Sequence, residues 1–233
     1  MQLPYIYQIV HTCRYKARHL AEHCEVLERC YWQLQSRRIT LSRDDLSLRI
    51  ERLLRESRVL EKLSTHVEIR LWCDGHTTIE IGEKTIYEGY TLRCFNPFAV
   101  IQCYDNPMGD YPTSARRAVA ELAHHKSRME GADVSIRCGE DGVVYSCYDS
   151  PLFGIKGRTV FLSPSLPSVE RSVGVYAINR CGYEFIERPI LREHLAKFDE
   201  LFWVDAFGVT AIAQFEKRRY MSIMAEKIAQ QLR

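Results

Sequence analysis

Two periodic patterns of apolar residues follow one another in the first third of the chain. A short apolar run from Leu3 to Val10 predicts a strand. Residues 17–35 then carry apolar side chains at spacings of three and four, which predicts one buried helix face formed by Leu20, Cys24, Leu27, Tyr31 and Leu34. Ser42 and Asp45 form a capping-box pattern, which predicts the start of a second helix that ends near Lys62.

From Val67 to Tyr104 the pattern becomes that of strands. Turn-forming residues separate segments rich in branched and aromatic side chains, which predict an antiparallel meander: VEIRLWC, TTIEI, TIYEGYTL and PFAVIQCY. The stretch from Asp105 to Pro112 is dominated by turn formers. It therefore predicts a boundary between a first lobe of residues 1–105 and a second lobe of residues 112–233.

The second lobe is predicted to begin with a helix over residues 114–129, with an inner face of Ala115, Val119, Leu122 and Met129. Four strand-like segments follow: VSIRC, GVVYSC, PLFGIKG and RTVFLSP. A helix over residues 168–180 is predicted next, ending before Gly182, with an inner face of Val169, Val173, Tyr176 and Ala177.

The last part of the chain predicts a strand in YEFIERPI, a short helix over residues 191–197 and a strand in ELFWVDAF. A terminal amphipathic helix carries Met221, Met224, Ile228 and Leu232. Helices and strands are mixed in both halves, so the expected fold class is α+β with two lobes.

Composition narrows the possible partners. Lysine and arginine total 32 and aspartate and glutamate total 30, so charge gives no reason to expect binding to nucleic acid or to a membrane. The cysteines contain no CxxC pair, which disfavours a zinc site or a disulfide framework: Cys13, Cys24, Cys30, Cys73, Cys94, Cys103, Cys138, Cys147 and Cys181. No apolar run suits a signal peptide or membrane span, and we expect a cytoplasmic protein with reduced thiols.

The order of short motifs in the second half resembles that of the class IV aminotransferase and aminodeoxychorismate lyase family. The motifs are Gly131-Ala132-Asp133, Glu140-Asp141-Gly142, Leu152-Phe153, Lys156-Gly157, Ser163-Pro164, residues 166–171, Glu187-Arg188-Pro189-Ile190 and Asp199-Glu200-Leu201-Phe202. In the first half, Tyr7, His23 and the strand Val67–Gly75 resemble family positions more weakly. The resemblance implies a class IV aminotransferase-like fold, a homodimer and a ligand cleft between the lobes.

The resemblance also implies pyridoxal phosphate chemistry, but the residues for it are replaced. Thr113 or Ser114 occupies the position of the Schiff-base lysine, and Ser146 that of the carboxylate facing the pyridine nitrogen. Val26 occupies the position of a phosphate-binding arginine. Ser168-Val169-Glu170-Arg171 stands for the phosphate loop, where Glu170 brings a like charge; Thr210 is a further altered cleft position.

Each altered residue also has a structural explanation. Thr113 suits the N-cap of the following helix, Val26 suits helix packing, and Arg171 suits either an ion pair or a ligand contact. His23 is expected to pack its helix, although it could face the cleft. His124 and His125 are adjacent on a helix and cannot easily share one metal ion.

Three functions remain open. The first is a protein that has lost pyridoxal phosphate-dependent catalysis and keeps the fold for binding a small ligand or for interaction. The second is an active aminotransferase or lyase that uses pyridoxal phosphate on a relocated lysine, Lys126 or Lys156. The third is cofactor-free chemistry that uses Arg171, Asp205, Thr210 or Cys147.

Overall fold

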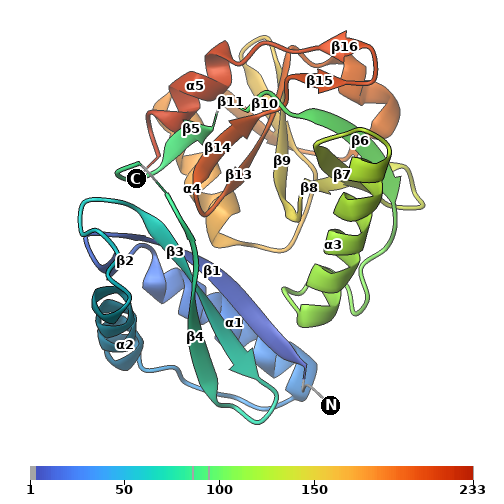
Figure 1. The fold of residues 1–233 in the computed structure, drawn as a ribbon. Coiled ribbons are helices and arrows are strands. Elements are labelled where there is room, and N and C mark those ends of the chain that lie inside the picture. The colour runs from blue at the N-terminus through green and yellow to red at the C-terminus, as the bar shows by residue number, and fades with distance from the viewer. Residues whose placement is uncertain (1–3, 86, 94, 233) are drawn as a thin grey trace.

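The computed structural model describes residues 4–85, 87–93 and 95–232, which form two lobes that meet face to face (Figure 1). The predicted strand start at Leu3, Ile86 within a predicted strand, and Cys94 lie outside the described residues. Each lobe is built on its own sheet with helices packed against it. The α+β class predicted from the sequence is therefore confirmed.

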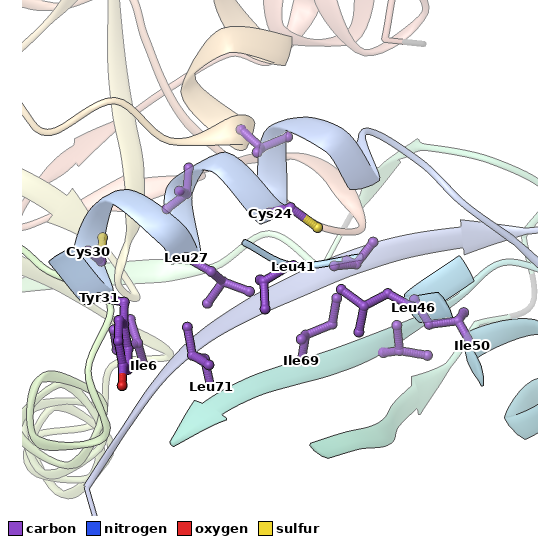
Figure 2. Packing of buried hydrophobic residues seen from close by; sticks show 14 of the residues in the cluster. Ile6, Cys24, Leu27, Cys30, Tyr31, Leu41, Leu46, Ile50, Ile69 and Leu71 are labelled. Atoms are coloured by element: carbon purple, nitrogen blue, oxygen red, sulfur yellow. The ribbon is translucent and has the colours of Figure 1, made fainter. Parts of the chain in front are cut away.

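The first lobe is an antiparallel sheet covered on one face by two helices (Figure 1). Its strands lie in the order β2-β1-β3-β4: β2 (Lys16–Ala17), β1 (Tyr5–Cys13), β3 (Thr65–Trp72) and β4 (Thr77–Lys84). The helices are α1 (Leu20–Gln35) and α2 (Arg43–Glu56). Between sheet and helices, Figure 2 shows a core in which Leu27, Ile50 and Ile69 are fully buried. Burial of each such side chain stabilises the lobe by roughly 1.5–3 kcal/mol.

Helix α2 begins as predicted and ends earlier than predicted. The Ser42 hydroxyl accepts a hydrogen bond from the Asp45 amide at 3.2 Å, which confirms Ser42 as the N-cap. The helix ends at Glu56 because Arg58 adopts a left-handed conformation with φ 52°, and its amide bonds back to Arg55. This geometry, with the Val59 amide bonded to the Leu54 carbonyl, is a Schellman motif that usually carries glycine. Because arginine and not glycine stands at this position, the sequence does not indicate where the helix ends.

The second lobe is a curled mixed sheet with helices around it. Its central strand order is β16-β15-β6-β7-β8-β9-β13-β14-β5. The strands are β5 (Thr91–Arg93), β6 (Phe98–Cys103), β7 (Val134–Cys138), β8 (Val143–Cys147), β9 (Ser150–Lys156), β10 (Thr159–Leu162), β11 (Glu184–Glu187), β12 (Ile190–Leu191), β13 (Glu200–Asp205), β14 (Gly208–Ala211), β15 (Gln214–Phe215) and β16 (Arg218–Arg219). The helices are α3 (Ser114–Met129), α4 (Val169–Arg180), the 3-10 helix η1 (Arg192–Lys197) and α5 (Ile223–Ala229).

The predicted antiparallel meander is wrong beyond Lys84. β5 pairs in parallel with β14, and β6 pairs in parallel with both β15 and β7. Strand propensity identifies such segments but not their partners, which here lie far along the chain. The change of sheet falls between Lys84 and Thr91; the division into folding units at residues 105–112 stays a prediction.

Two predicted helix faces also need correction. On α3 the buried residues are Ala120, Ala123 and Ser127, whereas Leu122 is 70% and Met129 77% exposed. Small side chains let α3 lie close to the sheet, and the charged side chains of its first turns form ion pairs toward the lobe interface. Tyr176 on α4 is 49% exposed because Gly174 and Ile178 face the core instead.

The last helix is shorter than predicted. Met221 precedes the N-cap residue Ser222 and is exposed, whereas Ile228 is buried in the second-lobe core as predicted. Gly182 follows α4 with φ 69°, in the left-handed region, as its predicted place after the helix end requires.

Candidate functional site

A cavity of about 230 Å³ lies between the two lobes. The first lobe contributes β1 and α1 to its wall, and the second lobe contributes the start of α3, strands β7 and β8, the β8–β9 turn and the loop before α4. The polar residues of the wall are Tyr7, Gln8, Arg29, Asp110, Arg116, Arg117, Glu121, Arg137, Tyr145, Ser146, Tyr148, Asp149, Ser150, Ser165, Ser168, Glu170 and Asp205. The wall thus combines arginines with carboxylates.

Of the altered positions predicted to lie in a cleft, Val26, Ser146, Ser168 and Glu170 line this cavity. Asp205, a candidate for cofactor-free chemistry, lines it as well. The structure therefore brings predicted residues from α1, β8, the start of α4 and β13 together in one cavity wall.

The other predicted positions serve the structure around the cavity. The Thr113 hydroxyl accepts a hydrogen bond from the Arg116 amide at 3.2 Å, which confirms it as the N-cap of α3. Val169 is buried in the first-lobe core. Arg171 pairs with Glu187, and the fully buried Thr210 accepts a hydrogen bond from the Arg93 Nε at 2.8 Å.

One side of the cavity is a closed network of charged and polar groups that joins the lobes. Asp149 accepts hydrogen bonds from the Tyr7 hydroxyl at 2.9 Å and from the Arg116 Nε at 2.6 Å. The other Arg116 nitrogens bind the Asp110 and Asp149 carbonyl oxygens, so every guanidinium nitrogen has an acceptor. Beside it, Arg117 binds both Glu68 oxygens at 2.7 Å. Burial raises the pKa of Tyr7, so its hydroxyl stays protonated.

The backbone that carries Asp149 has an uncommon conformation. Tyr148 and Asp149 form the two-residue loop between the paired residues Cys147 and Ser150, with φ values of 44° and 63°. A two-residue hairpin loop with both residues in the left-handed region usually carries asparagine, aspartate or glycine, so Tyr148 is unusual there. Such conformations persist where surrounding contacts hold them. Asp149 was not singled out by the sequence, because its partners, Tyr7 and Arg116, come from two distant segments.

Another part of the cavity wall is shaped by a bulge in β8. Arg137 lies opposite Ser146, and the next pair is Cys138 with Val144, so Tyr145 is the extra residue. The Arg137 guanidinium lies 4.6 Å above the centre of the Tyr145 ring, and one of its nitrogens binds Asp110 Oδ1 at 2.7 Å. The Arg137 Nε and the Ser146 Oγ are buried with no hydrogen-bond partner among the described residues.

A third part of the wall is acidic. Burial raises the pKa of Glu170, which lies in the first turn of α4. Asp205 accepts hydrogen bonds from the Trp203 Nε1 and the Phe207 amide, each at 2.9 Å, and pairs with Arg93. Glu170 and Asp205 thus give this part of the wall two carboxyl groups, and burial favours the neutral form of Glu170.

Neither lysine considered as a relocated anchor lies in this cavity. Lys156 donates a hydrogen bond to the Lys197 carbonyl at 2.8 Å, at the outer end of β9. Lys126 is exposed on α3 and pairs with Glu130 at 3.9 Å. Within the described residues, no lysine contributes to the cavity wall.

The cysteine and histidine candidates are also buried away from it. Burial raises the pKa of Cys147 and lowers the pKa of His23 to about 3, and the His23 Nδ1 lies 2.8 Å from the Gln8 Oε1. In the part of the chain that the structure describes, no group of histidine, cysteine and acidic residues is arranged to hold a metal ion. Across the same residues, no helix is long and apolar enough to span a membrane.

Comparison with known proteins identifies the fold. No protein-family model matches the sequence, and no curated protein matches it either. Among solved structures, the chain is similar to a branched-chain aminotransferase from Thermoproteus uzoniensis with 15% identity, a TM-score of 0.81, and coverage of 98% of this chain and 84% of that one. A hypothetical aminotransferase from Mycobacterium tuberculosis, bound to α-ketoglutarate and PMP, shares 12% identity with a TM-score of 0.80, covering 97% and 87%.

A third similar structure is a branched-chain amino acid aminotransferase from Escherichia coli, with 16% identity, a TM-score of 0.76, and coverage of 93% of this chain and 79% of that one. At such identities the likeness concerns the fold and not the chemistry. The chain therefore has the class IV aminotransferase fold over nearly its whole length.

Proposed function

We propose that this protein has lost pyridoxal phosphate-dependent catalysis and uses the cavity between its lobes to bind a small ligand without a covalent bond. The observation that carries the proposal is that the cavity wall has no lysine among the described residues. Without a primary amine in reach, the aldehyde of the cofactor has no group with which to form its Schiff base.

The other cofactor contacts are replaced as well. Ser146 supplies a neutral hydroxyl where the resembling family has a carboxylate, so a protonated ring nitrogen would lack its counter-charge. Glu170 lies at the helix start where the phosphate would bind, and its ionised form would oppose that charge. The residues of this cavity therefore do not fit pyridoxal phosphate.

The test is direct. Wild-type protein is incubated with excess pyridoxal phosphate, and absorbance in the internal-aldimine band is measured before and after borohydride reduction. We expect no band and no reduced adduct on a cavity residue by mass spectrometry. A stable adduct in the folded protein would overturn the proposal.

The same experiment addresses an active enzyme with a relocated lysine. That function requires the adduct to map to Lys126 or Lys156 and to disappear in the corresponding Lys→Ala variant. The contacts of these lysines outside the cavity disfavour it. A homodimer, implied by the resemblance, belongs to the proposal too and is measurable by light scattering.

A further inference from the structure

Arg137 is unusual because it is buried and mostly unpaired. Arg137 is only 6% exposed. A guanidinium carries five N–H donors, and within the described residues the only acceptor found for them is Asp110 Oδ1 at 2.7 Å. Burial of unpaired donors costs free energy, and the cost is larger for a charged group than for a neutral one.

Arg116 provides the internal comparison. It lines the same cavity, and all three of its nitrogens bind acceptors within the protein. Its hydrogen bonds are thus committed to holding the β8–β9 turn. Arg137 keeps donors for a group that the described part of the chain does not supply.

The neighbouring Ser146 hydroxyl is also buried without a hydrogen-bond partner among the described residues. Ser146 is 5% exposed, and its Oγ has no partner among the described residues. Arg137 and Ser146 are direct partners across the antiparallel β7–β8 pair, so their side chains lie on the same face of the sheet. Both contribute to the cavity wall.

The surroundings hold the guanidinium in place. The bulge at Tyr145 sets its ring 4.6 Å from the guanidinium carbon, and the Tyr145 hydroxyl is fixed by a 2.7 Å hydrogen bond to Asp141. A stacked and anchored arginine loses little conformational freedom when it binds, which favours a ligand with strong acceptor atoms.

We infer that Arg137 and Ser146 form a binding site for an oxyanion, a carboxylate or a phosphate group on a small ligand. The oxygens of such a group accept hydrogen bonds from the free Arg137 donors and the Ser146 hydroxyl, and its charge attracts the guanidinium. Asp110 balances part of the Arg137 charge, so the site relies on directed donors more than on net charge. The inference rests on the proposed noncovalent function and names the chemistry of its ligand.

The experiment titrates wild-type protein with inorganic phosphate and, separately, with acetate, using calorimetry at ionic strength held constant with sodium chloride. We expect saturable binding of at least one of the two, and the stronger of them identifies the oxyanion class. Response to neither anion, or density for water alone beside Arg137 in crystals grown with saturating phosphate or acetate, would overturn the inference.

Variants separate this site from general charge effects. Ser146→Ala should weaken binding about tenfold, since it removes one hydrogen bond to a charged group. Arg137→Gln should weaken binding more, and Ser146→Glu should abolish it by giving Arg137 an internal partner. Arg128→Gln, which removes an exposed charge from the last turn of α3, is the matched control and should leave affinity unchanged.

If Arg137→Gln does not fold, the two Ser146 variants decide, because they alter a small side chain. Equal affinity in wild type and in folded Ser146→Glu would contradict the site. Absence of anion binding together with absence of an aldimine overturns the oxyanion site alone. A reducible aldimine overturns the proposed function and this inference with it.

Discussion

Two parts of the interlobe cavity wall use arginine in different ways. At the start of α3, Arg116, Asp149 and Tyr7 bind one another, the Asp110 carbonyl oxygen accepts a hydrogen bond from the remaining Arg116 nitrogen, and the network joins the lobes. Around β7 and β8, Arg137 and Ser146 are buried, and among the described residues Arg137 has a hydrogen bond only to Asp110, while its Nε and the Ser146 Oγ have no hydrogen-bond partner. The difference shows that the hydrogen bonds of an arginine in a cavity wall, and not its charge, indicate whether it has donors left for a ligand.

The largest effect is expected for Asp149→Asn, which disrupts the hydrogen-bond network of Arg116, Asp149 and Tyr7. Asparagine tolerates the left-handed conformation, so the change removes mainly the charge. It leaves the partly buried Arg116 guanidinium without its counter-charge, and we expect the free energy of unfolding to fall by about 3 kcal/mol in urea denaturation, the lower end of the range for a buried pair. Glu51→Gln, which breaks an exposed pair with Arg55, is the control and should change it by no more than about 1 kcal/mol. A loss in Asp149→Asn no larger than in this control would show that the network is dispensable.

A smaller effect concerns His11, another group that links the lobes. Its Nδ1 lies 2.7 Å from the Ala206 carbonyl oxygen, and burial lowers its pKa from 6.5 to about 4. The unfolded chain therefore binds a proton that the folded protein excludes, so stability is full above pH 6.5 and is lost as the pH falls toward 4.

The measurement for His11 is the free energy of unfolding at pH 7 and pH 4.5. In His11→Gln the loss on acidification should be smaller than in wild type by on the order of 2 kcal/mol. The exposed His125 on α3 supplies the control, because His125→Gln should keep the wild-type pH dependence. Identical pH dependence in His11→Gln would contradict the assignment.

The smallest expected effect tests whether Thr113 is purely structural. Thr113→Ala should lower the free energy of unfolding by about 1 kcal/mol through loss of the N-cap hydrogen bond to α3. Thr113→Ser should retain most of it, and anion affinity should stay unchanged in both. A change in anion affinity would instead connect this position to the cavity.

Local signals in the sequence predicted the elements well where one residue type dominates the outcome. Ser42 and Thr113 indicate helix starts because a hydroxyl at the N-cap accepts a hydrogen bond from a backbone amide of the first turn. The end of α2 was missed because Arg58 takes a position that glycine usually fills. The partners of β5 and β6 were missed because pairing depends on the whole sheet.

The candidate site was predictable only in part, and for the same reason. Ser146 and Glu170 emerged from the resemblance, since they replace charged or polar groups at family positions. Asp149 and Arg137 gave no signal. Asp149 acts through a two-residue loop, and Arg137 acts through a bulge that changes the register by one residue. Neither the loop conformation nor the bulge follows from the alternation of apolar residues.

The position of β6 between β15 and β7 affects how the chain folds during its synthesis on the ribosome. The nascent chain exposes the first-lobe strands and both their helices early, so that lobe can fold while translation continues. β6 gains its neighbour β7 soon afterwards but keeps an open edge until β15 emerges, after α4 and β13. An open strand edge invites pairing with other chains, and during this interval the nascent protein is most exposed to aggregation and to capture by chaperones.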